Sequence, residues 1–113
     1  KGYNIYVTNG VNYIVAKEGD TFESLAEIFC ISARNLRKFN DLKGKAQPVR
    51  GEQIYIDRKQ KRWEGNAHTH ICRQGETAYA VGQSYAIRTR SIEKLNKLRP
   101  GDTLEQGRQI RIK

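Results

Sequence analysis

Metal-binding or nucleophilic side chains fall within five positions of this sequence, at His68, His70 and Cys72. They alternate, so in an extended strand they would share one face. At about 3.3 Å per residue the outer two would lie about 13 Å apart, too far for one ion with ligand bonds of about 2.0–2.3 Å. Two of them with a more distant ligand remain an alternative. We expect exposed strand residues, no metal site and no cofactor.

The acidic residues do not predict catalysis either. A glycosidase needs two carboxylates that face one cleft, and no acidic pair recurs along the chain. Asp20 and Glu76 stand 56 residues apart, each directly before a threonine, and are typical of residues that begin a helix. A Cys–His nucleophile of Cys72 with His68 or His70 is a remaining alternative. We predict no catalytic residues and a chain that is not an enzyme.

A repeat with a spacing of 56 residues must position all of these side chains. With Gly19 aligned on Gly75, about 40 positions follow without a gap. The matches fall on apolar residues and on Gly, Thr, Asn and Gln: Thr21/Thr77, Leu25/Val81, Phe29/Tyr85, Leu36/Ile92, Asn40/Asn96, Leu42/Leu98, Gly51/Gly107, Gln53/Gln109 and Ile54/Ile110. The chain therefore consists mainly of two copies of one small module.

The first copy predicts a strand, two helices and a strand. Residues 13–15 and 53–56 are short runs rich in β-branched and aromatic residues, which favour strands. Four apolar residues follow the spacing of one helical face: Phe22, Leu25, Ala26 and Phe29. Ser32 can begin a second helix that Asn40 ends.

The start of the first helix has two candidate caps, Asp20 and Thr21. Glu23 follows Asp20 by three residues, as in a capping box. In the second copy Arg88 stands at the place of the Ser32 cap, for which Thr89 is a substitute.

The first helix of the second copy has smaller residues on its inner face. Ala78 replaces Phe22 and Gly82 replaces Ala26. We therefore expect this helix to pack less tightly than its counterpart.

These elements predict an α+β fold of two βααβ modules, each a two-stranded antiparallel sheet with two helices on one face. Asn9-Gly10 between alternating segments is a strong hairpin signal, so residues 3–8 should add a strand to the first module. The predicted organisation is an N-terminal strand or hairpin segment at 1–12, modules at 13–56 and 67–113, and a basic linker at 57–66.

Charge is concentrated in the second half of the chain. Net charge is +9; residues 1–56 carry 8 Lys/Arg and 6 Asp/Glu, whereas residues 57–113 carry 13 and 6. The run Arg58-Lys59-Gln60-Lys61-Arg62 favours a solvated linker, with attraction to polyanions as the alternative. Cys30 and Cys72 are not equivalent in the repeat, so one bridge between the copies stays open. No apolar stretch approaches the about 20 residues of a membrane span.

With these elements placed, the sequence resembles the LysM domain. The first copy has Tyr13-x-Val15, Gly19-Asp20-Thr21, Leu25-Ala26, Phe39-Asn40, Gly51-x-Gln53 and Ile54-x-Ile56 in the order of the family pattern. The second copy has Gly75-Glu76-Thr77, Leu95-Asn96-x-Leu98 and Gly107-x-Gln109-Ile110-x-Ile112. It departs from the pattern at the end of each first helix, where Cys30 and Ala86 replace the common glycine, and in both loops after the second helix.

The resemblance implies non-catalytic binding of N-acetylglucosamine-containing glycans, peptidoglycan above all, in a shallow groove between the loop before the first helix and the loop after the second. Backbone N–H and C=O groups of such loops can pair with the acetamido group. The implied binding residues are Gly19, Asp20, Thr21, Phe22, Leu42, Lys43 and Gly44 in the first copy and Gly75, Glu76, Thr77, Ala78, Leu98, Arg99, Pro100 and Gly101 in the second.

The implied setting is the cell envelope, periplasmic or extracellular. The chain begins at Lys1 without Met, so we expect a mature or excised fragment that anchors a larger protein, with a catalytic domain before Lys1. We expect no membrane partner. Two alternatives stay open: a protein-interaction or spacer module that kept the fold but lost the sugar site, and a basic nucleic-acid-binding module.

Overall fold

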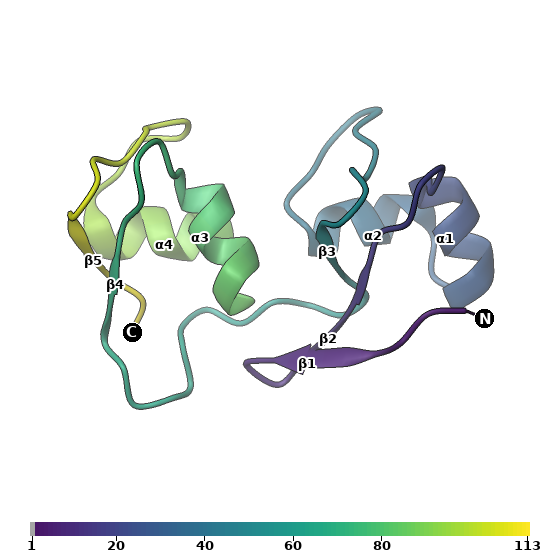
Figure 1. Ribbon diagram of the computed structural model, residues 1–113, viewed down its shortest axis with the longest axis horizontal. Coiled ribbons are helices and arrows are strands. Elements are labelled where there is room, and N and C mark those ends of the chain that lie inside the picture. The colour runs from purple at the N-terminus through teal and green to yellow at the C-terminus, as the bar shows by residue number, and fades with distance from the viewer. Residues whose placement is uncertain (1) are drawn as a thin grey trace. The chain divides into compact units, whose positions relative to one another are not determined.

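The structure is a computed structural model that describes residues 2–113. The chain forms two compact units, Lys1–Lys59 and Gln60–Lys113, which are described separately (Figure 1). None of the helices in the described residues combines the length and apolar content that a membrane crossing requires.

The first unit contains a three-stranded antiparallel sheet and two helices. The strands β1 (Tyr6–Thr8), β2 (Val11–Val15) and β3 (Gln53–Tyr55) lie in the order β1-β2-β3, with α1 (Phe22–Phe29) and α2 (Ala33–Phe39) between β2 and β3 in sequence. Asn9 and Gly10 both have positive φ, 55° and 75°, as the tight turn between β1 and β2 requires. The added N-terminal strand is confirmed, although it is shorter than residues 3–8.

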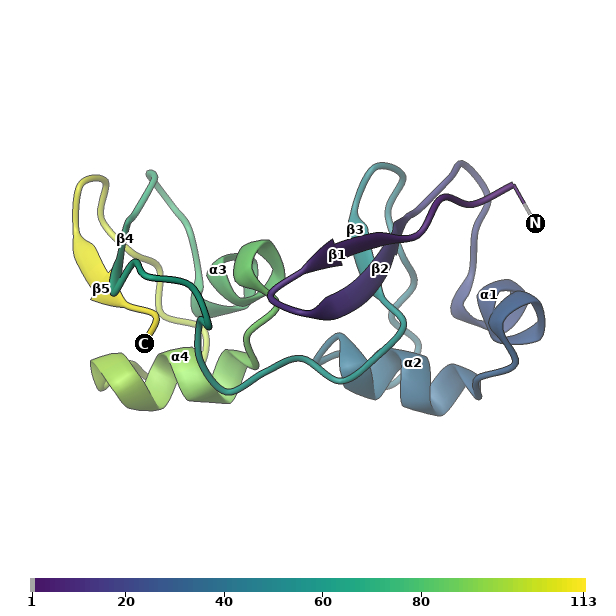
Figure 2. The ribbon, with the colours of Figure 1, turned by 90° about the horizontal axis from the view of Figure 1, so that it is seen from below.

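The core of the first unit lies between one face of the sheet and both helices. Ile14 on β2 pairs with Ile54 on β3, and both side chains are buried. They pack in one cluster with Leu25 of α1 and Leu36 of α2. Both helices therefore cover the same face of the sheet, and Figure 2 shows α1 and α2 on one side of β2 and β3.

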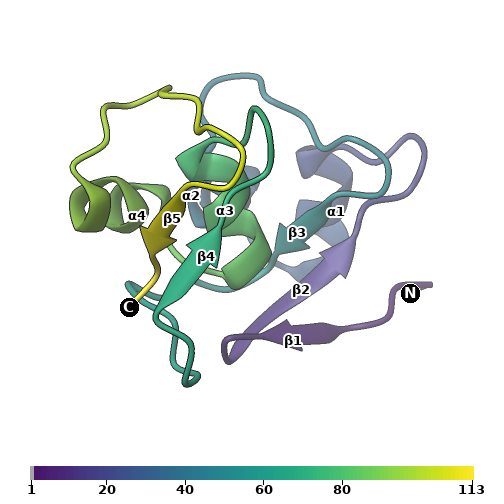
Figure 3. The ribbon, with the colours of Figure 1, turned by 60° about the vertical axis from the view of Figure 1, so that its left-hand side comes forward.

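The second unit repeats this arrangement without the additional strand. Strands β4 (Thr69–Ile71) and β5 (Gln109–Arg111) pair antiparallel, as their arrows show in Figure 3, and α3 (Ala78–Tyr85) and α4 (Thr89–Asn96) lie between them in sequence. Its core joins both helices to the sheet through Val81, Ile92 and Ile110. The predicted α+β fold of two βααβ modules is confirmed.

The expectation that α3 packs loosely is wrong. Gly82 is buried, and a Cβ there would lie 2.5 Å from the carbonyl oxygen of Ile87. The chain folds back in the same way in the first module, where Ile31 N–H donates to Ala26 C=O at 3.2 Å, but with Gly82 the bond from Ile87 N–H is shorter, at 2.9 Å. The missing side chain at Gly82 thus lets the backbone at Ile87 pack directly against α3.

A repeated asparagine joins the second helix of each module to its last strand. The Asn40 amide donates to the carbonyls of Leu36 and Tyr55 at 2.8 and 2.9 Å and accepts from Tyr55 N–H at 2.8 Å. Asn96 makes the same three bonds to Ile92 and Arg111. The sequence placed these residues at helix ends, but their fixing of the final strand is a tertiary role.

The basic segment 57–66 was expected to be a solvated linker, but parts of it are buried. Lys59 is 2% exposed, and its Nζ lies 2.6 Å from Asp41 Oδ2. Trp63 packs against the second core, and its N–H donates to Ile112 C=O at 2.7 Å. A lysine stem can be buried when its ammonium group is paired, which charge counting along the sequence cannot detect.

Candidate functional site

The loop before the first helix of each module is held by a threonine cap. Thr21 Oγ1 accepts from Ser24 N–H at 2.9 Å, and Ser24 Oγ accepts in return from Thr21 N–H at 3.0 Å. Thr77 Oγ1 accepts from Ala80 N–H at 3.2 Å. Thr21 is therefore the cap, and the predicted capping box of Asp20 with Glu23 is wrong.

The aligned acids Asp20 and Glu76 close the same turn in the two modules. An Asp20 carboxylate oxygen accepts from Lys17 N–H at 2.7 Å, and Glu76 accepts from the aligned Arg73 N–H at 2.8 Å. Burial by itself would raise the pKa of Glu76, but this backbone hydrogen bond and the His70 ring outweigh it and lower the pKa. Both carboxylates therefore stabilise the turn before the first helix of their own module.

Four glycines of the predicted binding loops expose their backbone. Gly19, Gly44, Gly75 and Gly101 have φ of +82°, +64°, +77° and +85°, and a Cβ at any of them would meet nothing within 4 Å. The left-handed conformation explains why glycine forms these turns. The space beside these glycines is open, although Gly75 N–H itself donates to Leu104 C=O at 3.2 Å.

The apolar residues of the predicted site are core residues. Phe22 packs in one cluster with Leu42, and Ala78 packs in another with Leu98. Phe22 is fully buried, and Gln47 covers its backbone N–H, so a ligand can reach that group only if Gln47 moves. In each module the structure therefore connects the two predicted loops through the core beneath them.

In the first module the Gln47 side chain hydrogen-bonds to the backbone N–H of Phe22, the first residue of α1. Gln47 Oε1 accepts from Phe22 N–H at 2.8 Å, and Gln47 Nε2 donates to Glu23 Oε1 at 2.8 Å. Arg37 Nη2 lies 2.9 Å from Glu23 Oε2. The hydrogen bonds from Gln47 and then Arg37 lower the pKa of Glu23. Sequence reasoning missed Gln47, because nothing in its local pattern marks a glutamine that reaches α1.

In the second module the start of the first helix is instead paired with backbone groups of the loop that follows the second helix. Thr77 forms an isolated antiparallel bridge with Thr103, which aligns with Gln47, and Leu104 N–H donates to Glu76 C=O at 2.7 Å. Pro48 aligns with Leu104 and has no N–H to donate. The two modules therefore differ in the loops that the family resemblance assigns to the sugar.

The remaining predicted residues lie on exposed turns. Arg99 N–H donates to Asp102 at 2.9 Å within the turn that holds Pro100 and Gly101. In the first module, the loop after α2 lines a shallow pocket of about 420 Å³ that is mainly basic. Its lining residues are Arg34, Arg37, Lys38, Leu42, Lys43 and Gly44.

The expectation of exposed residues on the His68–Cys72 strand is wrong for two of them. Cys72 is 2% exposed, and the His70 side chain is 14% exposed; only His68 is exposed. Burial, and then the Glu76 charge, raise the pKa of the Cys72 thiol. Cys30 is exposed, and both Cys30 and Cys72 are free thiols rather than partners in a disulfide.

Comparison with known families assigns the repeat. The model of the family described as LysM domain matches residues 14–57 and 70–113, which together make up most of the chain. The chain belongs to the LysM domain family. LysM domains are binding domains rather than catalytic ones, and in general they bind peptidoglycan and other N-acetylglucosamine polymers. The resemblance found in the sequence is confirmed.

The tandem LysM chain is also similar to part of a larger curated protein. It is 29% identical over 104 residues to a protein named autolysin from Enterococcus faecalis (strain ATCC 700802 / V583), covering 85% of this chain and 14% of that protein. The chain therefore spans about a seventh of the length of that relative.

Two solved structures also match, both of the spore cortex-lytic enzyme SleL. The Bacillus cereus enzyme has 20% identity and a TM-score of 0.40, covering 91% of this chain and 22% of that one. The Bacillus megaterium QM B1551 enzyme has 25% identity and a TM-score of 0.39, covering 97% and 22%. TM-scores below 0.5 support no structural argument about this chain.

Proposed function

We propose that this chain binds N-acetylglucosamine-containing glycan without catalysis, and that its ligand is bacterial peptidoglycan. The observation that carries the proposal is that the same two glycine-containing loops, with open space beside their glycines, recur in both LysM modules. An acetamido group has one donor, one acceptor and a methyl group. Backbone N–H and C=O groups in these loops suit the first two.

Charge favours peptidoglycan over chitin as the ligand. Net charge is +9, and exposed Arg34, Lys38 and Lys43 line the pocket beside the first module's loop. Peptidoglycan carries carboxylates in its peptides, whereas chitin is neutral. Cationic side chains beside a sugar site would attract the anionic polymer.

We infer that both modules contribute to binding. A ligand must displace Gln47 from Phe22 N–H in the first module, and in the second it meets a loop that is bridged through Thr77 and Thr103. Each site alone should therefore bind weakly, and two sites on one polymer add avidity.

The proposed setting is the cell envelope, where the chain anchors a larger wall-lytic protein. The similarity to an autolysin supports this role, since the chain corresponds to only 14% of that protein. A catalytic domain elsewhere in the same protein would then act on the polymer that the LysM modules hold.

Sedimentation with insoluble peptidoglycan and with chitin, in moderate salt, tests the proposal. We expect the chain to be retained on peptidoglycan more strongly than on chitin. Retention on neither polymer would favour a spacer module and contradict the proposal. Binding to nucleic acid with a steep salt dependence, together with no retention on either polymer, would favour the basic alternative.

An NMR titration with N-acetylglucosamine oligomers localises the site. We expect amide shifts at residues 19–22 and 42–45 in the first module and at 75–78 and 98–101 in the second. Glucose oligomers of the same linkage are the matched control, because they lack only the acetamido group. Equal shifts with both ligands would exclude acetamido recognition.

A further inference from the structure

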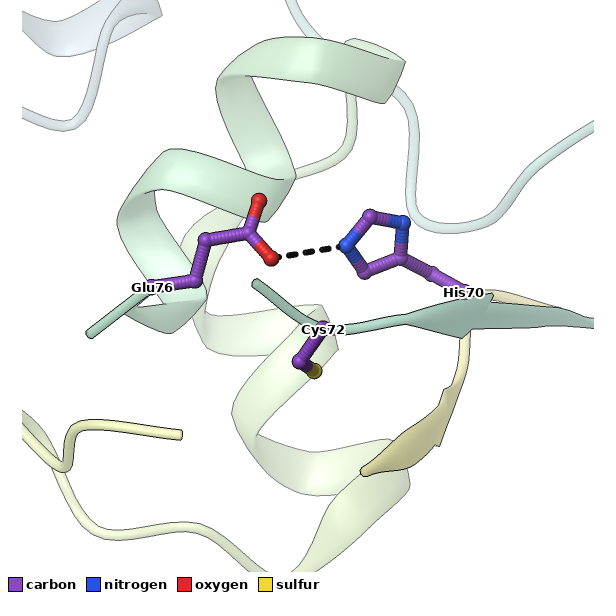
Figure 4. A group of neighbouring side chains, drawn as sticks. All are labelled: His70, Cys72 and Glu76. Atoms are coloured by element: carbon purple, nitrogen blue, oxygen red, sulfur yellow. Dashed lines mark hydrogen bonds and ion pairs between the residues drawn. The ribbon is translucent and has the colours of Figure 1, made fainter. Parts of the chain in front are cut away.

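Three side chains that can bind a metal ion come together in the second module. They are distinct from the backbone groups proposed to contact the sugar. His70 lies on β4, Cys72 directly follows that strand, and Glu76 lies in the turn before α3 (Figure 4). One ring nitrogen of His70, Cys72 Sγ and a Glu76 carboxylate oxygen all lie within 4.8 Å of one another. The sequence spacing did not predict Glu76 as the third member, because Glu76 approaches the strand only through the turn before α3.

The first module shows that the fold does not require these residues. At the positions aligned with His70 and Cys72 it has Ile14 and Ala16, which are core residues at 0% and 3% exposure. The second module therefore places an imidazole and a thiol where its duplicate has apolar side chains. Burial of an imidazole costs free energy, so packing alone does not explain the exchange of Ile14 for His70.

Further contacts hold the ligands in place. Tyr85 OH lies 2.8 Å from His70 Nδ1, and Trp63 packs edge-on against the Tyr85 ring at 5.3 Å between centroids. Arg73 N–H fixes the Glu76 carboxylate. Metal-binding histidines commonly donate their second ring N–H to such a partner, so Nε2 is left to face Glu76 and Cys72.

The separations suit one ion after a small adjustment. His70 Nε2 lies 2.9 Å from Glu76 Oε1, slightly less than the about 3.3 Å between ligands of a tetrahedral ion with bonds of about 2.0–2.3 Å. Cys72 Sγ lies at most 4.8 Å from a ring nitrogen of His70 and a carboxylate oxygen of Glu76, so it needs to approach them by about 1 Å on the same criterion. The His70 and Glu76 side chains are 14% and 15% exposed, so an ion can enter from solvent.

We propose that His70 Nε2, Cys72 Sγ and Glu76 Oε1 bind one divalent transition-metal ion, with zinc as the best match and water as the fourth ligand. A nitrogen, a sulfur and an oxygen donor together suit zinc or cobalt rather than magnesium or calcium. On binding, the thiol proton and any proton on Nε2 pass to solvent, and Tyr85 accepts from Nδ1–H. The ion would join β4 to the start of α3 through the Glu76 side chain, whereas the sugar contacts proposed for this turn are made by its backbone.

Titration of the chelator-treated chain with Zn²⁺ and Co²⁺ tests the site. We expect one equivalent of Zn²⁺ to bind by calorimetry with proton release. One equivalent of Co²⁺ should give a thiolate-to-cobalt charge-transfer band and the strong visible bands of tetrahedral cobalt. The absence of a charge-transfer band from the wild-type chain would overturn the proposal whatever the variants do.

Matched variants assign the ligands. Cys72→Ala and His70→Ile restore the residues of the first module, so both should fold, and each should weaken Zn²⁺ binding at least about 100-fold, beyond the 10–100-fold typical of outer-shell changes. Cys30→Ala and His68→Ala alter exposed residues and should keep the wild-type affinity. A charge-transfer band that survives Cys72→Ala but is lost in Cys30→Ala would assign the metal to Cys30 and refute the site.

Discussion

The side-chain oxygen of Gln47 accepts a 2.8 Å hydrogen bond from the backbone N–H of Phe22, at the loop to which the LysM resemblance assigns the sugar. A glutamine side chain ends in a carboxamide, which presents the same donor and acceptor types as an acetamido group. Its nitrogen is held by Glu23 at 2.8 Å. The first module thus pairs its own carboxamide with a group that the proposed ligand would use.

Gln47→Ala should strengthen glycan binding by the first module. A net hydrogen bond of about 1 kcal/mol corresponds to about fivefold in affinity, and the freed Phe22 N–H becomes available to the ligand. The Phe22 amide shift in an NMR titration with N-acetylglucosamine oligomers measures this affinity. Thr103→Ala, at the aligned position of the second module, is the control and should leave the first module unchanged. Weaker binding after Gln47→Ala would mean that Gln47 itself contacts the sugar.

Asn40→Ala should destabilise the first module by about 3 kcal/mol, because it leaves buried N–H and C=O groups of Tyr55 without their partner. Asn40 is fully buried, whereas Asn96 is partly exposed, so Asn96→Ala should cost only about 1–2 kcal/mol. Urea unfolding followed by separate probes of the two modules gives both values. Equal losses would show that burial does not set the difference.

Replacing one partner of the Lys59–Asp41 pair should cost more than replacing both. Burial lowers the pKa of Lys59, and the Asp41 charge opposes that shift. Asp41→Asn leaves an ammonium group in the interior without its carboxylate and should destabilise by about 3 kcal/mol. Lys59→Met with Asp41→Asn should recover most of this loss, as measured in a double-mutant cycle of denaturant unfolding. Additive losses would contradict coupling between the two charges.

The Tyr3–Asp20 hydrogen bond should make stability fall at high pH. Burial first, and then the 2.5 Å hydrogen bond and charge of Asp20, raise the pKa of Tyr3 from 10.0 to about 12. A folded-state pKa above the unfolded value contributes stability that is complete below pH 10 and is lost as the pH rises towards about 12.

Tyr3→Phe is the matched control for this pH dependence, since it keeps the ring that packs edge-on against Phe29. The difference in unfolding free energy between wild type and Tyr3→Phe should shrink between pH 10 and 12. A constant difference over that range would show that the hydroxyl proton does not contribute.

Much of the fold follows from local patterns in the sequence. The apolar spacing of Phe22, Leu25 and Phe29 determines a helix and its buried face, Ser32 caps the next helix through Asn35 N–H, and Asn9-Gly10 determines the hairpin. The 56-residue repeat then extends the first module's elements to the second, where local signals are weaker. These features depend on neighbours within a few residues, which is why sequence reasoning reaches them.

Contacts between residues distant in sequence required the tertiary structure. The reach of Gln47 to Phe22 over 25 residues and the burial of Lys59 against Asp41 leave no periodic trace. The alternation of His70 and Cys72 is visible in the sequence, but Glu76 joins them only because the turn before α3 folds back to the strand. Sequence determined the duplicated LysM fold; the tertiary structure decided which side chains of each copy meet, because long-range packing rather than local spacing sets those distances.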